Sequence, residues 1–197
     1  FPTLIEYYAA RERDTNPPSE TFPDGAAWLD ENGVFHQTSP QPLTPMEELP
    51  FIYDEAGRME GFKNRIIYYE TSRGCPFSCS YCLSSIDKKL RFRPLDTVKK
   101  ELAFFLEQRV PQVKFVDRTF NCKKSHAMAI WQFICDYDNG VTNFHFEIAA
   151  DILDEEEIAL LKTMRPGLVQ LEIGVQTANP DTIRAINRKM DLARVAQ

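Results

Sequence analysis

The sequence lacks a long apolar run, and no stretch of its 197 residues approaches the length of a membrane-spanning helix. Its start also lacks the basic and apolar segments of a secretory signal peptide. Acidic residues outnumber basic ones, and the formal net charge of −6 argues against general affinity for nucleic acid or an anionic membrane. We therefore expect a cytoplasmic globular protein without a membrane partner.

Cysteine is scarce, with five residues in all, and three of them lie close together at Cys75, Cys79 and Cys82. A secreted disulfide framework would usually show an even number spread along the chain. The run also lacks the fourth cysteine of a ferredoxin. We predict a metal site in a reducing compartment. We expect Cys122 and Cys135 to be ordinary residues, with Cys135 on the inward face of a helix.

Residues 1–62 have little periodic apolar sequence, so we interpret them as an N-terminal extension rather than a domain. Their composition predicts a short helix, a polar loop and a β-hairpin at residues 4–13, 14–24 and 26–36. Asn32-Gly33 is a strong signal for a two-residue hairpin turn, in which both central residues take positive φ. Closely spaced prolines from Pro40 onward then indicate an extended connector.

From residue 63 the pattern changes to strands alternating with helices. Apolar runs predict strands at residues 66–70, 113–116, 143–149 and 168–175. Helical spacing predicts helices at residues 96–108, at 125–137, from Asp154 with a capping box to Glu157, and from Asn179-Pro180 to about Arg188. This order predicts an α/β fold, a partial parallel (β/α) barrel of TIM-like type over residues 63–197, with ligands at the carboxyl ends of the strands.

The clustered cysteines follow the first predicted strand with the spacing Cys-x3-Cys-x2-Cys. Thiolates suit iron, and three of them on a four-iron cluster leave one iron open to a small molecule. Gly74 and Pro76 permit a tight loop. Two alternatives stay open. One is a zinc site with Cys122 or His126 as a fourth ligand, and the other is an iron–sulfur protein that only transfers electrons.

Cys75, Cys79, Tyr81 and Cys82 resemble the signature of radical S-adenosylmethionine (SAM) enzymes, Cys-x3-Cys-x-aromatic-Cys. The flanking Ser-Arg-Gly-Cys-Pro and Tyr-Cys-Leu-Ser-Ser resemble the subgroup whose longer members carry an N-terminal cobalamin-binding domain. The resemblance implies a 4Fe–4S cluster on the three cysteines. It also implies reductive cleavage of SAM to a 5′-deoxyadenosyl radical that abstracts a substrate hydrogen, with electrons from a low-potential donor of flavodoxin or ferredoxin type.

Later polar residues resemble the oxygen-independent coproporphyrinogen oxidase branch of this family. Glu147 lies on the third predicted strand, Gln176 follows the fourth in Gly-Val-Gln, and Arg188 ends Asn-Arg. By this resemblance Arg188 pairs with the SAM carboxylate, for which a guanidinium is well shaped. Glu147 and Gln176 hydrogen-bond the methionyl amine or the ribose hydroxyls. Taken singly, each residue also has a structural interpretation: an outward strand residue, a turn cap and a cation at a helix C-terminus.

The second strand departs from the family's pattern. Many members place Gly-Gly-Glu there, and its backbone meets the SAM amine, whereas this chain has Asp117 at about that position. We expect the Asp117 side chain to replace that contact or to serve the substrate. On the fourth strand, Glu172 is expected to touch the ribose or to pair with a neighbouring lysine or arginine.

The cobalamin-ligating pattern Asp-x-His-x-x-Gly is missing from the sequence. We therefore expect cobalamin, if the full-length protein uses it, to bind outside this chain. The first residue is not Met, and the chain offers fewer βα units than the family's barrels. These features predict a truncated barrel that is inactive by itself and whose sheet edge favours self-association. No residue pattern identifies the substrate.

Overall fold

The computed structural model describes residues 2–13, 22–55, 58–62 and 64–197 of the chain. The chain divides into two compact units, residues 1–44 and 45–197. Most of the polar loop predicted from the sequence, at residues 14–24, lies outside the described residues. Within the described ranges, no helix combines the length and the apolar character needed to cross a membrane.

The first unit contains a helix and a hairpin, formed by α1 (Pro2–Arg13), β1 (Ala27–Leu29) and β2 (Phe35–Gln37). The two strands pair antiparallel, as the sequence predicted. The predicted two-residue turn is wrong, because Gly33 has a φ of 76° but Asn32 is not in the positive-φ region. Instead, one carboxylate oxygen of Asp30 accepts hydrogen bonds from the backbone N–H groups of Asn32 and Val34, both at 2.9 Å.

The second unit is built on a four-stranded parallel sheet, as the alternation of strands and helices predicted. Its strands are β3 (Ile67–Tyr69), β6 (Gln112–Phe115), β7 (Asn143–Ile148) and β8 (Val169–Ile173), adjacent in that order. Successive side chains of a strand point to opposite faces of the sheet. Val113 and Phe115 on β6, and Phe144 and Phe146 on β7, are fully buried. One face of the sheet therefore forms the hydrophobic core.

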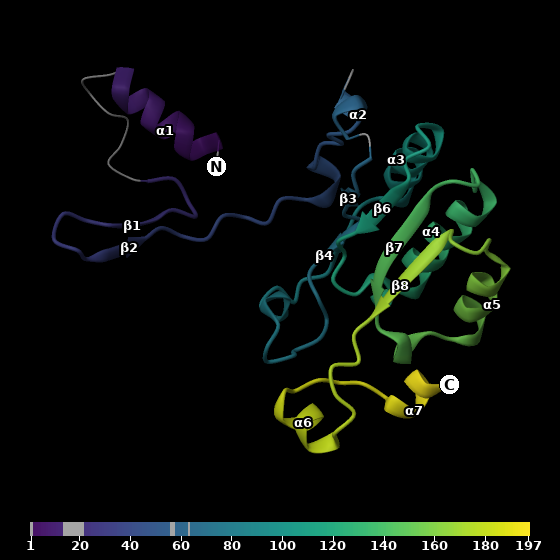
Figure 1. The fold of residues 1–197 in the computed structure, drawn as a ribbon. Helices are drawn as coiled ribbons and strands as arrows, with labels where there is room; N and C mark the ends of the chain where they lie inside the picture. Colours follow the sequence, from purple (N-terminus) through teal and green to yellow (C-terminus); the bar gives the residue numbers. More distant parts are fainter. Residues whose placement is uncertain (1, 14–21, 56–57, 63) are drawn as a thin grey trace. The chain divides into compact units, whose positions relative to one another are not determined.

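Three helices cover this buried face: α3 (Leu95–Glu107), α4 (Lys124–Asp136) and α5 (Glu155–Thr163) (Figure 1). Their inward residues are apolar and include Val98, Leu102, Phe105, Ala127, Ile130, Trp131 and Ile134. The predicted capping box of α5 is confirmed, with reciprocal hydrogen bonds between Asp154 and Glu157. Cys135, which was predicted to face inward, is only half-buried, and its Sγ lies 3.8 Å from Thr163 Oγ1. The result is a partial (β/α) barrel.

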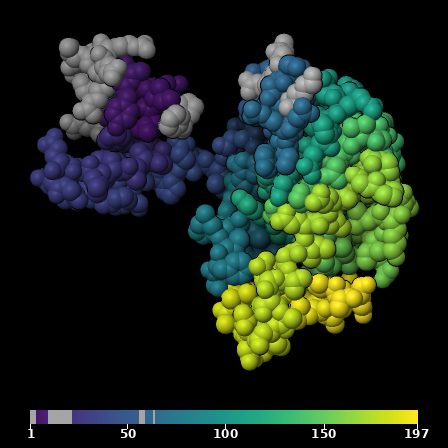
Figure 2. Space-filling model, viewed as in Figure 1, coloured from purple at the N-terminus to yellow at the C-terminus, as the bar shows by residue number. Residues whose placement is uncertain are grey.

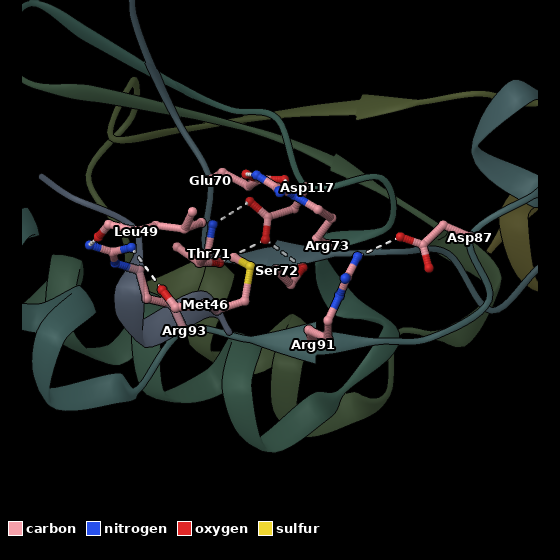
Figure 3. Close-up of polar contacts among 10 residues, drawn as sticks. All are labelled: Met46, Leu49, Glu70, Thr71, Ser72, Arg73, Asp87, Arg91, Arg93 and Asp117. Atoms are coloured by element: carbon pink, nitrogen blue, oxygen red, sulfur yellow. Dashed lines mark hydrogen bonds and ion pairs between the residues drawn. The ribbon is translucent and has the colours of Figure 1, made fainter. Parts of the chain in front are cut away.

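The second unit begins at residue 45, earlier than the predicted boundary between the extension and the barrel at residues 62 and 63. Arg93, which follows β5 (Arg91–Phe92), ties the early segment to the barrel. Its Nη1 donates to the carbonyl of Met46 at 3.1 Å, and its Nη2 donates to that of Leu49 at 2.9 Å (Figure 3). Met46 and Leu49, which the sequence assigned to the extension, are therefore hydrogen-bonded to the barrel.

Shorter elements complete the unit: α2 (Arg58–Gly61), β4 (Ser72–Arg73), α6 (Pro180–Ala185) and α7 (Leu192–Ala196). The helix predicted to reach about Arg188 ends early as α6. It ends because Asn187 takes a left-handed conformation with a φ of 49°, so Arg188 lies beyond a turn and is not a helical residue. The loop after β4 and the α6 segment lie at the end where the parallel strands finish (Figure 1).

Candidate functional site

The three clustered cysteines lie in a loop whose two ends are joined by a short antiparallel ladder of β4 and β5. The sequence did not predict this ladder. Inside it, the N–H of Cys75 donates to the carbonyl of Asp87 at 2.9 Å. Gly74 has a φ of 95°, and a Cβ there would lie 2.6 Å from the carbonyl oxygen of Lys89. Glycine is therefore required at the entry of the loop.

All three thiol-bearing residues line one cavity of about 230 Å³. Cys75 and Cys79 are 8% and 7% exposed, and Cys82 is half-buried. The other candidate site residues named from the sequence, except Asp117, line the same cavity: Tyr81, Glu147, Glu172, Gln176 and Arg188. Residues from the cysteine loop, from two strands and from the turn after α6 thus meet at the carboxyl end of the sheet.

The donor set suits a polynuclear cluster, in which each thiolate binds a separate iron. Within the described ranges, no three His, Cys, Asp or Glu side chains converge closely enough to hold a single metal ion. The two residues considered as a fourth zinc ligand do not line the cavity. Burial, with a smaller contribution from Cys75, raises the pKa of Cys122 to about 11. His126 Nε2 lies 3.2 Å from Thr71 Oγ1 and forms a hydrogen bond with it, so this nitrogen already has a partner away from the cavity.

Arg188 reaches the cavity from the turn after α6. Its Nη1 donates to the hydroxyl of Tyr81 at 2.8 Å and lies 4.0 Å from Cys79 Sγ, and its Nη2 donates to the carbonyl of Gly174. The Nε atom is buried and has no hydrogen-bond partner among the described residues. An unpaired guanidinium donor beside the cysteines is suited to an anionic group of a ligand.

The segment that carries Arg188 is held against the cysteine loop. The N–H of Ser80 donates to the carbonyl of Ile186 at 2.9 Å, and the Asn187 side-chain amide donates to the carbonyl of Ser78 at 3.0 Å. Figure 2 shows the two segments, teal and yellow-green, side by side at one end of the second unit. The position of Arg188 therefore depends on the cysteine loop as well as on α6.

Gln176 and two glutamates form another part of the cavity wall. Gln176 has a φ of 66°, and a Cβ at Gly174 would lie 2.6 Å from its Nε2. Glu147 and Glu172 are register partners on β7 and β8. Lys114 Nζ donates to Glu172 Oε2 at 3.0 Å, and this bond holds the pKa of Glu172 below its usual value. Glu172 thus pairs with a neighbouring lysine, one of its two predicted alternatives, and still lines the cavity.

Asp117 does not line the cavity and is fully buried. It accepts hydrogen bonds from the Thr71 N–H at 3.1 Å, the Thr71 hydroxyl at 2.8 Å and the Ser72 hydroxyl at 2.5 Å (Figure 3). Burial raises the pKa of Asp117 to about 6. The geometry gives Asp117 a structural role at the start of the cysteine loop, in place of the expected contact with SAM or substrate.

Several cavity residues were missed from the sequence, namely Arg118, Thr119, Asp151 and Lys189. Thr119 Oγ1 lies 3.7 Å from Cys75 Sγ, close enough for a weak hydrogen bond to sulfur. Arg118 and Thr119 come shortly after the end of β6. Their place at the carboxyl end of a barrel strand is the signal that could have found them.

Two curated proteins resemble the chain in sequence. An uncharacterized methyltransferase of Pyrococcus horikoshii is 32% identical over 107 residues, which are 51% of this chain and 23% of that protein. The bacteriochlorophyllide d C-12(1)-methyltransferase of Chlorobaculum tepidum is 23% identical over 160 residues, which are 79% of this chain and 34% of that protein. The chain thus spans about a quarter to a third of the length of these relatives.

Solved structures share the fold. The cobalamin-dependent SAM radical enzyme OxsB, with aqua-cobalamin bound, matches with a TM-score of 0.71 at 17% identity, over 98% of this chain and 29% of that one. The radical SAM methyltransferase TsrM of Kitasatospora setae, with cobalamin and a [4Fe–4S] cluster bound, matches with a TM-score of 0.67 at 17% identity, over 87% of this chain and 37% of that one.

The family model of the radical SAM superfamily matches residues 69–197. The match begins in β3 and takes in the cysteine loop, the rest of the sheet and the turn that carries Arg188. It therefore covers the whole cavity as well as most of the chain. The chain belongs to the radical SAM superfamily.

Proposed function

We propose that Cys75, Cys79 and Cys82 hold a 4Fe–4S cluster and that the adjoining cavity binds SAM. The observation that carries this proposal is the meeting of three thiols and the Arg188 side chain around one cavity. When bound, the reduced cluster would supply the electron that cleaves SAM to methionine and a 5′-deoxyadenosyl radical, which abstracts a substrate hydrogen. The electron would come from a low-potential donor of flavodoxin or ferredoxin type.

The chain's own residues would bind and orient SAM. Arg188 would place its guanidinium charge beside the SAM carboxylate, because its two Nη atoms are fixed by Tyr81 and Gly174 at the cavity wall. Glu147 and Glu172 offer acceptor oxygens to the ammonium group or to the ribose hydroxyls. Burial of Cys75 and Cys79 would limit the access of water to the cluster.

The relatives favour methyl transfer as the net reaction, because both curated relatives and TsrM are named methyltransferases. OxsB and TsrM have cobalamin bound in their structures. We extend the proposal to methyl transfer with cobalamin bound outside this chain. Methyl transfer from SAM would yield S-adenosylhomocysteine, whereas hydrogen abstraction alone would yield 5′-deoxyadenosine. Analysis of the SAM products formed in the presence of a substrate distinguishes the two.

Anaerobic reconstitution tests the cluster and the cleavage of SAM together. We expect about four irons per chain, as three thiolates and one open iron require, and 5′-deoxyadenosine from the full-length protein when SAM and a strong reductant are added. Cys75→Ala, Cys79→Ala and Cys82→Ala should lose both. Cys135→Ala is the matched control and should retain both. One zinc per chain in place of iron, or an intact cluster in Cys79→Ala, would overturn the proposal.

A further inference from the structure

The polar face of the sheet carries a lysine beneath the two cavity glutamates. Lys114 Nζ lies 3.0 Å from Glu172 Oε2 and 3.8 Å from Glu147 Oε1. The three residues lie on adjacent strands β6, β7 and β8. Glu147 and Glu172 line the cavity but Lys114 does not. Any effect of Lys114 on a ligand in the cavity would therefore pass through the two carboxylates.

The two glutamates need a cation between them. Glu147 and Glu172 are direct register partners, and like charges placed opposite one another on neighbouring strands repel. Lys114 is the lysine that reaches both. His145 also faces this group, with its Nε2 3.0 Å from Glu172 Oε2, but that nitrogen makes no hydrogen bond among the described residues. In the part of the chain that the structure describes, Lys114 carries the charge and also donates a hydrogen bond to Glu172 at 3.0 Å.

We propose that Lys114 is a positioning residue for SAM. It offsets the repulsion between Glu147 and Glu172 and holds their oxygens at the cavity wall, where they accept hydrogen bonds from the ammonium group or the ribose of SAM. The inference rests on the proposed function, because it takes SAM as the occupant of the cavity. It predicts that removal of the lysine weakens SAM binding although Lys114 itself does not line the cavity.

The test measures the dissociation constant of SAM for the anaerobically reconstituted protein by calorimetry. Lys114→Met should weaken binding by roughly tenfold, the effect expected for one lost charge-assisted hydrogen bond. Lys114→Arg should restore most of the affinity. The matched control is Lys124→Met. Lys124 Nζ also bridges two carboxylates, at 2.5 Å from Asp154 and 2.6 Å from Glu156, but lines no part of the cavity. Its loss should leave the affinity unchanged.

Double substitution separates positioning from a general loss of structure. If Lys114 acts through Glu172, Lys114→Met should add little to the loss caused by Glu172→Gln. The iron content of each variant should equal that of the wild type. Full additivity, or unchanged affinity in Lys114→Met, would overturn the inference while leaving the proposed function intact. Failure of the wild-type, cluster-loaded protein to bind SAM would instead overturn the proposed function itself.

Discussion

At the scale of single residues, the buried carboxylate of Asp117 anchors the start of the cysteine loop. It accepts hydrogen bonds from the N–H and hydroxyl of Thr71 and from the hydroxyl of Ser72. Asp117 is fully buried, and its pKa rises from 3.8 to about 6 because of that burial. Since the folded-state pKa is the higher one, folding favours the protonated form. The stability that Asp117 contributes is thus fully present below a pH of about 3.8 and is lost as the pH rises through about 6.

The variant Asp117→Asn tests this dependence, because an amide does not titrate. We expect the unfolding free energy of the wild type, minus that of the variant, to fall between about pH 4 and pH 7, by no more than about 3 kcal/mol. Urea denaturation at several pH values provides the measurement. A difference that stays constant or grows with pH would show that Asp117 is already ionised at low pH in the folded protein.

Arg188 is the residue with the most specific predicted contact. Arg188→Ala should weaken SAM binding by roughly 1.5–3 kcal/mol, the contribution of a hydrogen bond to a charged group. Arg188→Lys should rescue the loss only in part, because an ammonium group lacks the planar fork. Calorimetry on the reconstituted protein measures both. Equal SAM affinity in Arg188→Ala and the wild type would remove Arg188 from the SAM site.

The sequence located half of the cavity residues, because these belong to motifs whose order follows the order of the strands. The error at Asp117 has a simple physical cause. Side chains alternate along β6, so Val113 and Phe115 share the helix-covered face with Asp117, which continues that alternation. Lys114 lies between Val113 and Phe115 in sequence, so its side chain points to the opposite face of the sheet, toward the two glutamates. The alternation of side chains along β6 could therefore have excluded Asp117 from the SAM site and placed Lys114 on the same face as the glutamates.

At the scale of elements, one buried ion pair joins α3 to the strands and to the segment that precedes them. Arg93 Nη2 and Glu101 Oε1 lie 2.5 Å apart, with side chains 6% and 7% exposed, and the hydroxyl of Tyr69 donates to Glu101 Oε2 at 2.5 Å. Arg93→Met should destabilise the fold by about 3–5 kcal/mol, because it leaves a buried carboxylate without its cation.

An exposed pair supplies the control for that measurement. The side chains of Arg184 and Asp181 pair within α6 and are 73% and 84% exposed. Arg184→Met should change the unfolding free energy by less than about 1 kcal/mol, as is usual for a surface ion pair. Urea denaturation of both variants compares them directly. A loss in Arg93→Met as small as that in Arg184→Met would show that the buried pair contributes little.

Element types were predictable where apolar spacing was regular, as in α3, α4 and the four parallel strands. The errors fall where a single backbone conformation decides the outcome. The left-handed conformation of Asn187 ends α6 before Arg188, and the Asp30 side chain reshapes the hairpin turn. The secondary-structure propensities of Asn and Asp predict neither conformation, because both residues are compatible with a helix and with a turn.

At the scale of the whole molecule, the hydrophobic core belongs to one of the two units. All members of the main core cluster lie within residues 45–197. A chain of residues 45–197 should therefore unfold with a free energy within about 0.5 kcal/mol of that of the same region in the whole chain, since surface changes rarely exceed this value. Urea denaturation of the two chains makes the comparison. A markedly less stable shortened chain would show that the first unit supports the barrel.

The central claim is that Cys75, Cys79 and Cys82 hold a cluster with one iron open to SAM. Electron paramagnetic resonance of the reduced, anaerobically reconstituted protein, recorded with and without SAM, tests this claim most directly. The account predicts a cluster signal that changes when SAM is added, because SAM binds the open iron beside Arg188. Identical spectra at saturating SAM, in a preparation with about four irons per chain, would contradict it.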